Sequence, residues 1–106
     1  MSNEVSLQEL AEERKQGKSQ FLLDVREPDE LEISKLPEVY AIPMGEVPDR
    51  LAEIPRDQDV VVICRSGGRS GKITDFLIEN GYSRVRNLVG GMNGWATEVD
   101  PTLPTY

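Results

Sequence analysis

The sequence contains no histidine and a single cysteine, Cys64, among its 106 residues. Without histidine, the chain cannot form the Ser-His or Cys-His pairs that activate many protein nucleophiles, nor a metal site with imidazole ligands. A single cysteine excludes an internal disulfide and a zinc site of several cysteines, and it favours a reducing compartment. We therefore expect a cytoplasmic protein that binds no metal.

Long apolar runs and an excess of positive charge are also missing. No stretch approaches the ~20 apolar residues that span a bilayer, and the amino-terminal residues lack the pattern of a signal peptide. The 12 Lys and Arg against 19 Asp and Glu leave a formal net charge of −7, which repels the phosphates of nucleic acids and anionic membrane surfaces. We expect neither a nucleic-acid partner nor a membrane partner.

Alternating strand and helix patterns predict a single α/β domain over residues 1–106. Apolar, β-prone runs predict strands at 21–25, 40–42, 60–63 and 85–89. Capping residues and helical spacing predict helices at about 7–16, from Pro28, between 47 and 54, and after Gly68. This alternation indicates an open, mostly parallel sheet with helices on both faces. Residues 97–106, which include two prolines, are expected to form an extended tail.

The segment that joins the most β-prone strand to the next helix is the candidate site. It consists of Cys64, Arg65, Ser66, Gly67, Gly68, Arg69 and Ser70. Ligands of open parallel sheets bind at the carboxyl ends of the strands, and two adjacent glycines let successive backbone N–H groups converge on an anion. The same surroundings stabilise a thiolate, so Cys64 is predicted to be reactive rather than a buried structural thiol. Either arginine of the segment could instead brace the loop or face solvent.

Several motifs, in a fixed order, make the chain resemble a known family. They are Leu23-Asp24-Val25-Arg26-Glu27 with Glu30, Ile42-Pro43, Val62 to Ser70, and Asn87-Leu88 with Gly90-Gly91 and Trp95. Together they resemble a single-domain rhodanese, the sulfurtransferase family that carries sulfur as a cysteine persulfide. The resemblance implies an α/β parallel sheet and a nucleophile at Cys64 whose extra sulfur is cradled by loop amides. It implies no cofactor beyond the covalent persulfide.

The chemistry that the resemblance implies is transfer of a sulfane sulfur in two covalent steps. Cys64 would take the sulfur from thiosulfate, as in a thiosulfate sulfurtransferase, or from the persulfide of a cysteine desulfurase. It would then pass the sulfur to a thiol, to cyanide or to a carrier protein. Arg65 and Arg69 would attract anionic donors. Asp24 and Arg26 match a recurring pair of the family, but their position at a strand end favours a structural role near the site mouth.

The end of the chain and the length of the loop bear on the partners and on the competing functions. Residues 95–106 resemble the terminus of rhodanese domains fused to E1-like adenylyltransferases, which implies a ubiquitin-like sulfur carrier as a partner; a tail along the surface is the alternative. A Cys-dependent phosphatase or arsenate reductase and a non-catalytic binding module also stay open. Four residues separate Cys64 from Arg69, whereas those phosphatases have five, so the tighter loop favours sulfur.

Overall fold

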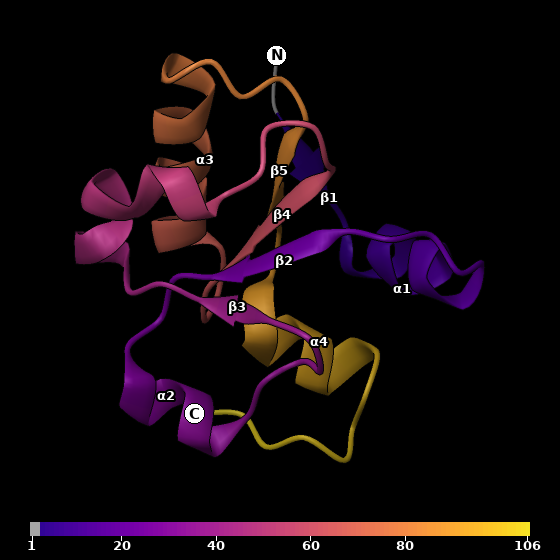
Figure 1. Ribbon diagram of the computed structural model, residues 1–106. Coiled ribbons are helices and arrows are strands. Elements are labelled where there is room, and N and C mark those ends of the chain that lie inside the picture. The colour runs from indigo at the N-terminus through magenta and orange to yellow at the C-terminus, as the bar shows by residue number, and fades with distance from the viewer. Residues whose placement is uncertain (1–2) are drawn as a thin grey trace.

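The structure, a computed structural model, describes residues 3–106 and has a five-stranded parallel sheet between two layers of helices (Figure 1). The strands are β1 (Glu4–Val5), β2 (Phe21–Asp24), β3 (Tyr40–Ala41), β4 (Val60–Ile63) and β5 (Val85–Leu88). The helices are α1 (Leu7–Lys15), α2 (Pro28–Ile33), the 3-10 helix η1 (Met44–Glu53), α3 (Gly68–Glu79) and α4 (Gly91–Glu98). Within the described residues, no helix is long and apolar enough to cross a membrane.

The sheet order is β1-β5-β4-β2-β3, and every neighbouring pair is parallel. β4 lies at the centre, and all four of its branched side chains are fully buried. Val60 and Val62 face the core layer under α3 and η1, whereas Val61 and Ile63 face the layer under α1 and α4. The run of four branched residues therefore correctly predicted a strand that is covered on both faces. The predicted α/β fold is confirmed.

Three details differ from the sequence predictions. β1 was not predicted, because two residues are too short to show a periodic pattern; it pairs with β5 at the edge of the sheet. The helix expected between 47 and 54 is a 3-10 helix that breaks at Arg50, and Pro48 inside it has no N–H to donate. The tail begins later than residue 97, because α4 continues to Glu98 and the next two amides still bond to the Trp95 carbonyl. Trp95 itself is buried, as expected.

The first turn of α4 fastens the backbone at the carboxyl end of β4. The amide of Met92 donates to the carbonyl of Cys64 at 2.9 Å, and the amide of Asn93 donates to that of Arg65 at 3.0 Å. These bonds bring the start of α4 very close to the loop. A β-carbon at Gly91, whose φ is +57°, would lie 2.5 Å from the Cys64 carbonyl oxygen. Glycine at this position is therefore required both by the backbone conformation and by the contact.

Replacing Gly91 with alanine should lower the free energy of unfolding by about 2 kcal/mol or more, because it combines a left-handed backbone with a steric clash. The measurement is urea denaturation followed by circular dichroism. Gly45→Ala is the matched control, since a β-carbon there meets nothing within 4 Å, and it should leave stability nearly unchanged. Equal stability of the Gly91→Ala and wild-type proteins would contradict the proposed contact.

Candidate active site

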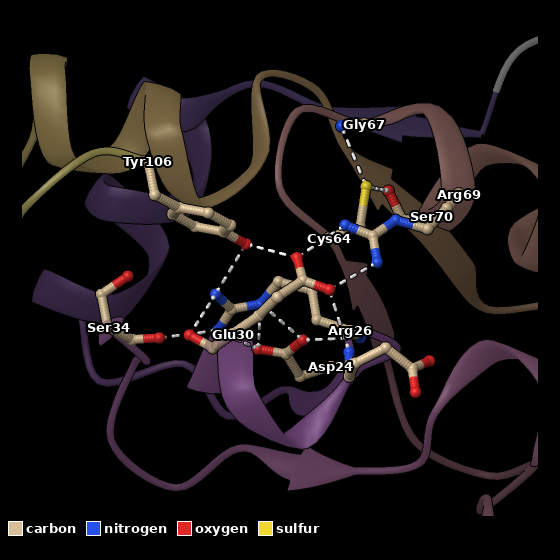
Figure 2. Close-up of polar contacts among 10 residues, drawn as sticks. Asp24, Arg26, Glu30, Ser34, Cys64, Gly67, Arg69, Ser70 and Tyr106 are labelled. Carbon is tan, nitrogen blue, oxygen red and sulfur yellow. Dashed lines mark hydrogen bonds and ion pairs between the residues drawn. The ribbon is translucent and has the colours of Figure 1, made fainter. Parts of the chain in front are cut away.

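Cys64 follows β4 directly, and its thiol points into the loop before α3 (Figure 2). The amide of Gly67 donates to Sγ at 3.0 Å, and the Ser70 hydroxyl lies 3.2 Å from Sγ. The residue is only 1% exposed. This burial alone would raise the pKa of Cys64, but hydrogen bonds from the Ser70 hydroxyl and from amides of Ser70, Gly67 and Ser66 outweigh it. The pKa of Cys64 is therefore below its usual value, so the thiolate is favoured.

The loop holds this arrangement through one left-handed glycine and one buried amide side chain. Gly67 has φ +111°, a conformation that turns its amide toward the sulfur and that residues with a β-carbon rarely adopt. Asn87, on β5, donates from Nδ2 to the Gly67 carbonyl at 3.1 Å, and its Oδ1 lies 2.5 Å from the Ser70 hydroxyl. Asn87 is thus the residue that ties the loop to the sheet.

Ser70 has one hydroxyl proton and two acceptors within reach, Cys64 Sγ and Asn87 Oδ1. A thiolate is a stronger acceptor than a neutral amide oxygen, because hydrogen bonds to charged groups are about twice as strong as neutral ones. Ionisation of Cys64 therefore draws the Ser70 proton to the sulfur. The hydroxyl is a switchable donor, whereas the backbone amides are permanent ones.

The two arginines of the loop are engaged by other residues. Arg69 makes a two-pronged ion pair with Glu30, with Nη1–Oε1 at 2.7 Å and Nη2–Oε2 at 2.8 Å. Arg65 is exposed, and its guanidinium donates to the main-chain oxygen of Tyr106 and lies over the ring of that residue. Ser66 and Gly68, also exposed, form the rim of the loop. Of the two alternatives for these arginines, bracing the loop or facing solvent, Arg69 therefore fits the first.

Asp24 and Arg26 form a buried ion pair at the end of β2. Their side chains are 0% exposed, and Arg26 Nη2 lies 2.7 Å from Asp24 Oδ2. Arg26 also donates to the carbonyl of Ser34 at 2.8 Å and to that of Glu30 at 3.3 Å. The buried arginine therefore holds the segment through α2 from within the protein. Its contacts are those of a structural residue.

Three residues that border the site were not predicted as part of it: Glu30, Asn87 and Tyr106. Glu30 belonged to a recognised motif, but its charge suited the first turn of a helix equally well. Asn87 also belonged to a recognised motif, and a polar residue within a predicted strand was a usable signal; the structure shows that it is buried. Tyr106 carried no local signal, because it reaches Glu30 across 76 positions of sequence.

The arrangement provides a nucleophile that needs no separate base. A buried sulfur with several hydrogen-bond donors can hold a negative charge, both as a thiolate and as a sulfur adduct that carries the same charge one atom further out. Within residues 3–106, no group of three or more His, Cys, Asp or Glu side chains could hold a metal ion.

Ser70→Ala should raise the pKa of Cys64, because it removes the side-chain hydrogen bond that favours the thiolate. Alkylation of Cys64 by iodoacetamide should then be slower at pH 7, and the midpoint of its rate–pH curve should move to higher pH. Ser66→Ala is the matched control, because Ser66 is exposed and supplies its amide, which the substitution keeps. Coincident rate–pH curves for Ser70→Ala and wild type would contradict the role of the hydroxyl.

Asp24→Asn should lower the free energy of unfolding by about 3 kcal/mol, because it leaves the buried Arg26 charge without its counter-charge. Denaturant unfolding measures the change. Glu46→Gln provides the comparison, since it breaks an ion pair with Arg50 in which the Glu46 side chain is 58% exposed, and exposed pairs contribute little. If the two substitutions changed stability equally, the buried pair would not have the structural role assigned to it.

The chain matches known proteins along nearly its whole length. Residues 6–98 match the Rhodanese-like domain family. A sulfurtransferase from Allochromatium vinosum is 40% identical over 96 residues, which cover 91% of this chain and 90% of that protein. An "adenylyltransferase and sulfurtransferase MOCS3" from Caenorhabditis briggsae is 34% identical over 111 residues, which cover 96% of this chain and 28% of that protein.

A solved structure has the same fold. The crystal structure of a rhodanese-related protein from Thermoplasma volcanium matches with a TM-score of 0.84 and 30% identity, over 92% of this chain and 93% of that one. The family match thus agrees with the parallel sheet, with the loop after β4 and with the resemblance carried by the sequence motifs. The chain belongs to the rhodanese-like domain family.

Proposed function

We propose that this protein is a sulfurtransferase that carries a sulfane sulfur as a persulfide on Cys64. The observation that carries the proposal is the set of donors around Sγ: the Gly67 amide at 3.0 Å, the Ser70 hydroxyl at 3.2 Å, and further amides of the same loop. A small ring of donors suits a terminal sulfur anion. The sulfurtransferase name of the Allochromatium vinosum relative agrees with this chemistry.

In the first step, the Cys64 thiolate attacks the outer sulfur of a donor. With thiosulfate, the bond between Sγ and the sulfane sulfur forms as the sulfur–sulfur bond of the donor breaks, and sulfite leaves with the electron pair. With an organic persulfide, a thiolate leaves instead, and the persulfide proton goes to solvent or to that leaving group. No separate base is invoked at either step, because the loop donors lower the pKa of Cys64 and so favour the thiolate that attacks.

In the second step, the acceptor attacks the outer sulfur of the Cys64 persulfide. An acceptor thiolate forms a new sulfur–sulfur bond as the bond to Sγ breaks, so the acceptor becomes a persulfide and Cys64 returns as a thiolate. No external oxidant or reductant enters the exchange. The loop donors stabilise the negative charge on the terminal sulfur in the loaded form and on Sγ in the free form.

The engagement of Arg69 favours sulfur transfer over phosphoryl or arsenate chemistry. An arginine that binds a transferred phosphoryl group presents both of its terminal nitrogens to the oxygens of that group. Here both nitrogens of Arg69 bind Glu30. The four-residue spacing between Cys64 and Arg69 points the same way. A binding module without turnover would have no need for a Cys64 pKa below the usual value.

The donor that we propose is thiosulfate or the persulfide of a protein such as a cysteine desulfurase, and the acceptor is a thiol, cyanide or a ubiquitin-like sulfur carrier. The match to the MOCS3 protein, whose name combines adenylyltransferase and sulfurtransferase, supports a place in a sulfur relay. A thiol that must stay unpaired to react suits a reducing compartment, so we propose the cytoplasm.

Incubation of the purified protein with thiosulfate, or with a desulfurase and cysteine, should add the mass of one sulfur atom. The adduct should disappear on treatment with cyanide or dithiothreitol, and Cys64→Ser should never acquire it. Intact-mass spectrometry under non-reducing conditions measures all three results. Because the chain has one cysteine, every thiol-reducible adduct reports on the same residue.

Two outcomes would overturn the proposal. If neither donor loaded the wild-type protein, sulfur transfer would be excluded. If the protein hydrolysed an aryl phosphate and Cys64→Ser did not, the phosphatase alternative would replace it. A Cys64→Ser protein that bound a carrier partner as tightly as wild type, alongside a wild-type protein that took up no sulfur, would indicate a binding module.

A further inference from the structure

Glu30 neutralises the arginine that closes the Cys64 loop. Its carboxylate binds both terminal nitrogens of Arg69, and its side chain is 15% exposed against 35% for the arginine. The Arg69 hydrogen bonds, followed by one from the Tyr106 hydroxyl, act against burial and lower the pKa of Glu30 to about 2. Glu30 therefore carries its negative charge at neutral pH.

Tyr106 joins Glu30 to the second arginine of the loop. The Tyr106 hydroxyl lies 2.6 Å from Glu30 Oε2, to which it donates, and accepts from Arg26 Nη1 at 3.1 Å (Figure 2). Its main-chain oxygen accepts from Arg65, and the Arg65 guanidinium stacks 5.0 Å from the centre of the Tyr106 ring.

The backbone of Tyr106 is anchored independently of these charged groups. Its amide donates to Asn93 Oδ1 at 3.1 Å, and its main-chain oxygen accepts from Asn93 Nδ2 at 3.0 Å. Asn93 belongs to α4, whose start is bonded to the backbone of Cys64 and Arg65. Figure 1 shows the tail passing from α4 to the vicinity of α2. Tyr106 is therefore held across the site by three separate parts of the chain.

These contacts oppose the binding of a small dianion. Arg69 already has a counter-charge, and Arg65 is engaged by the main-chain oxygen and the ring of Tyr106, so an anionic donor competes with a carboxylate for the first and with the tail for the second. It would also meet the carboxylate of Glu30 beside Arg69, a negative charge that acts at short range with little screening in a partly buried site. A donor with little charge at its sulfane sulfur pays no such cost.

We propose that Glu30 and Tyr106 are specificity-determining residues that bias the Cys64 site against small anionic donors such as thiosulfate and toward organic persulfides of low charge. The identity of the natural donor rests on the proposed sulfur transfer. The charge preference itself is a property of the site and can be measured with reagents that contain no sulfur donor.

The test compares iodoacetate with iodoacetamide. These two alkylating agents have the same leaving group and nearly the same size, but they differ by one charge. The measured quantity is the ratio of their second-order rate constants with Cys64, iodoacetate over iodoacetamide, at pH 7 and low ionic strength. A change in the thiolate fraction affects both reagents equally and cancels in this ratio. In the wild-type protein, the ratio should lie below that of N-acetylcysteine amide.

Glu30→Gln should raise this ratio about fivefold, because it removes one negative charge and frees Arg69. Tyr106→Phe should raise it about twofold, because it loosens Glu30 without changing any charge. Glu32→Gln is the control for Glu30→Gln, because it removes one negative charge from an exposed position of the same helix that does not bind Arg69. Tyr40→Phe is the control for Tyr106→Phe, because the Tyr40 hydroxyl bonds to Glu53 of η1 and not to Glu30. Both controls should leave the ratio unchanged.

The proposal is overturned if the wild-type ratio exceeds that of the free thiol, or if Glu30→Gln and Glu32→Gln change it equally. The comparison of the wild-type ratio with that of the free thiol needs no variant, so it tests the proposal even if Glu30→Gln fails to fold. Glu30→Gln should also lower the KM for thiosulfate about fivefold with little change in kcat. If no donor loads sulfur onto the protein, the proposed sulfur transfer fails while the alkylation ratio still decides the charge preference.

Discussion

A sulfur anion held inside a protein requires hydrogen-bond donors that cannot turn away, and this requirement organises the structure around Cys64. Backbone amides meet it, because their orientation is set by the chain and not by a rotatable side chain. The amide of Gly67 can face the sulfur only while Gly67 keeps its left-handed conformation. The carbonyl of Gly67 is held by Asn87 of the neighbouring strand. The central sheet thus determines the reactivity of the thiol by determining the path of the loop.

Around this neutral cradle lies a chain of alternating charges. Asp24 binds Arg26, the Tyr106 hydroxyl bridges Arg26 and Glu30, and Glu30 binds Arg69. The inner pair is fully buried, whereas the outer pair is partly exposed. Burial makes the inner pair costly to break and therefore structural, while partial exposure makes the outer pair less costly to break. One network therefore provides rigidity at its buried end and adaptability at its exposed end.

How well these features can be predicted from the sequence depends on how far apart in the chain the interacting residues lie. β4 and the loop after it were predictable, because a run of branched residues, a cysteine and two glycines act over a few positions. Gly67 and Ser70 were placed in the site for the same reason. The partner of Arg69 was not predictable, since Glu30 lies 39 positions away and any exposed acid would have served. β1 was missed because its two residues gain their strand conformation from β5 alone.

Tyr106 contacts Arg26 and Glu30 across 80 and 76 positions of the sequence, respectively. Contacts between such distant positions form after the local ones, because closing the intervening chain costs entropy that only a folded domain offsets. The tail rests on the finished domain and contributes no strand to the sheet, so it can detach with a smaller free energy than global unfolding. The thiolate cradle, built from β4, α3 and β5, stays intact when it does. In hydrogen-exchange terms, the tail and the thiolate cradle are separate units, so Tyr106 can leave Glu30 and Arg65 without loosening the donors that favour the Cys64 thiolate.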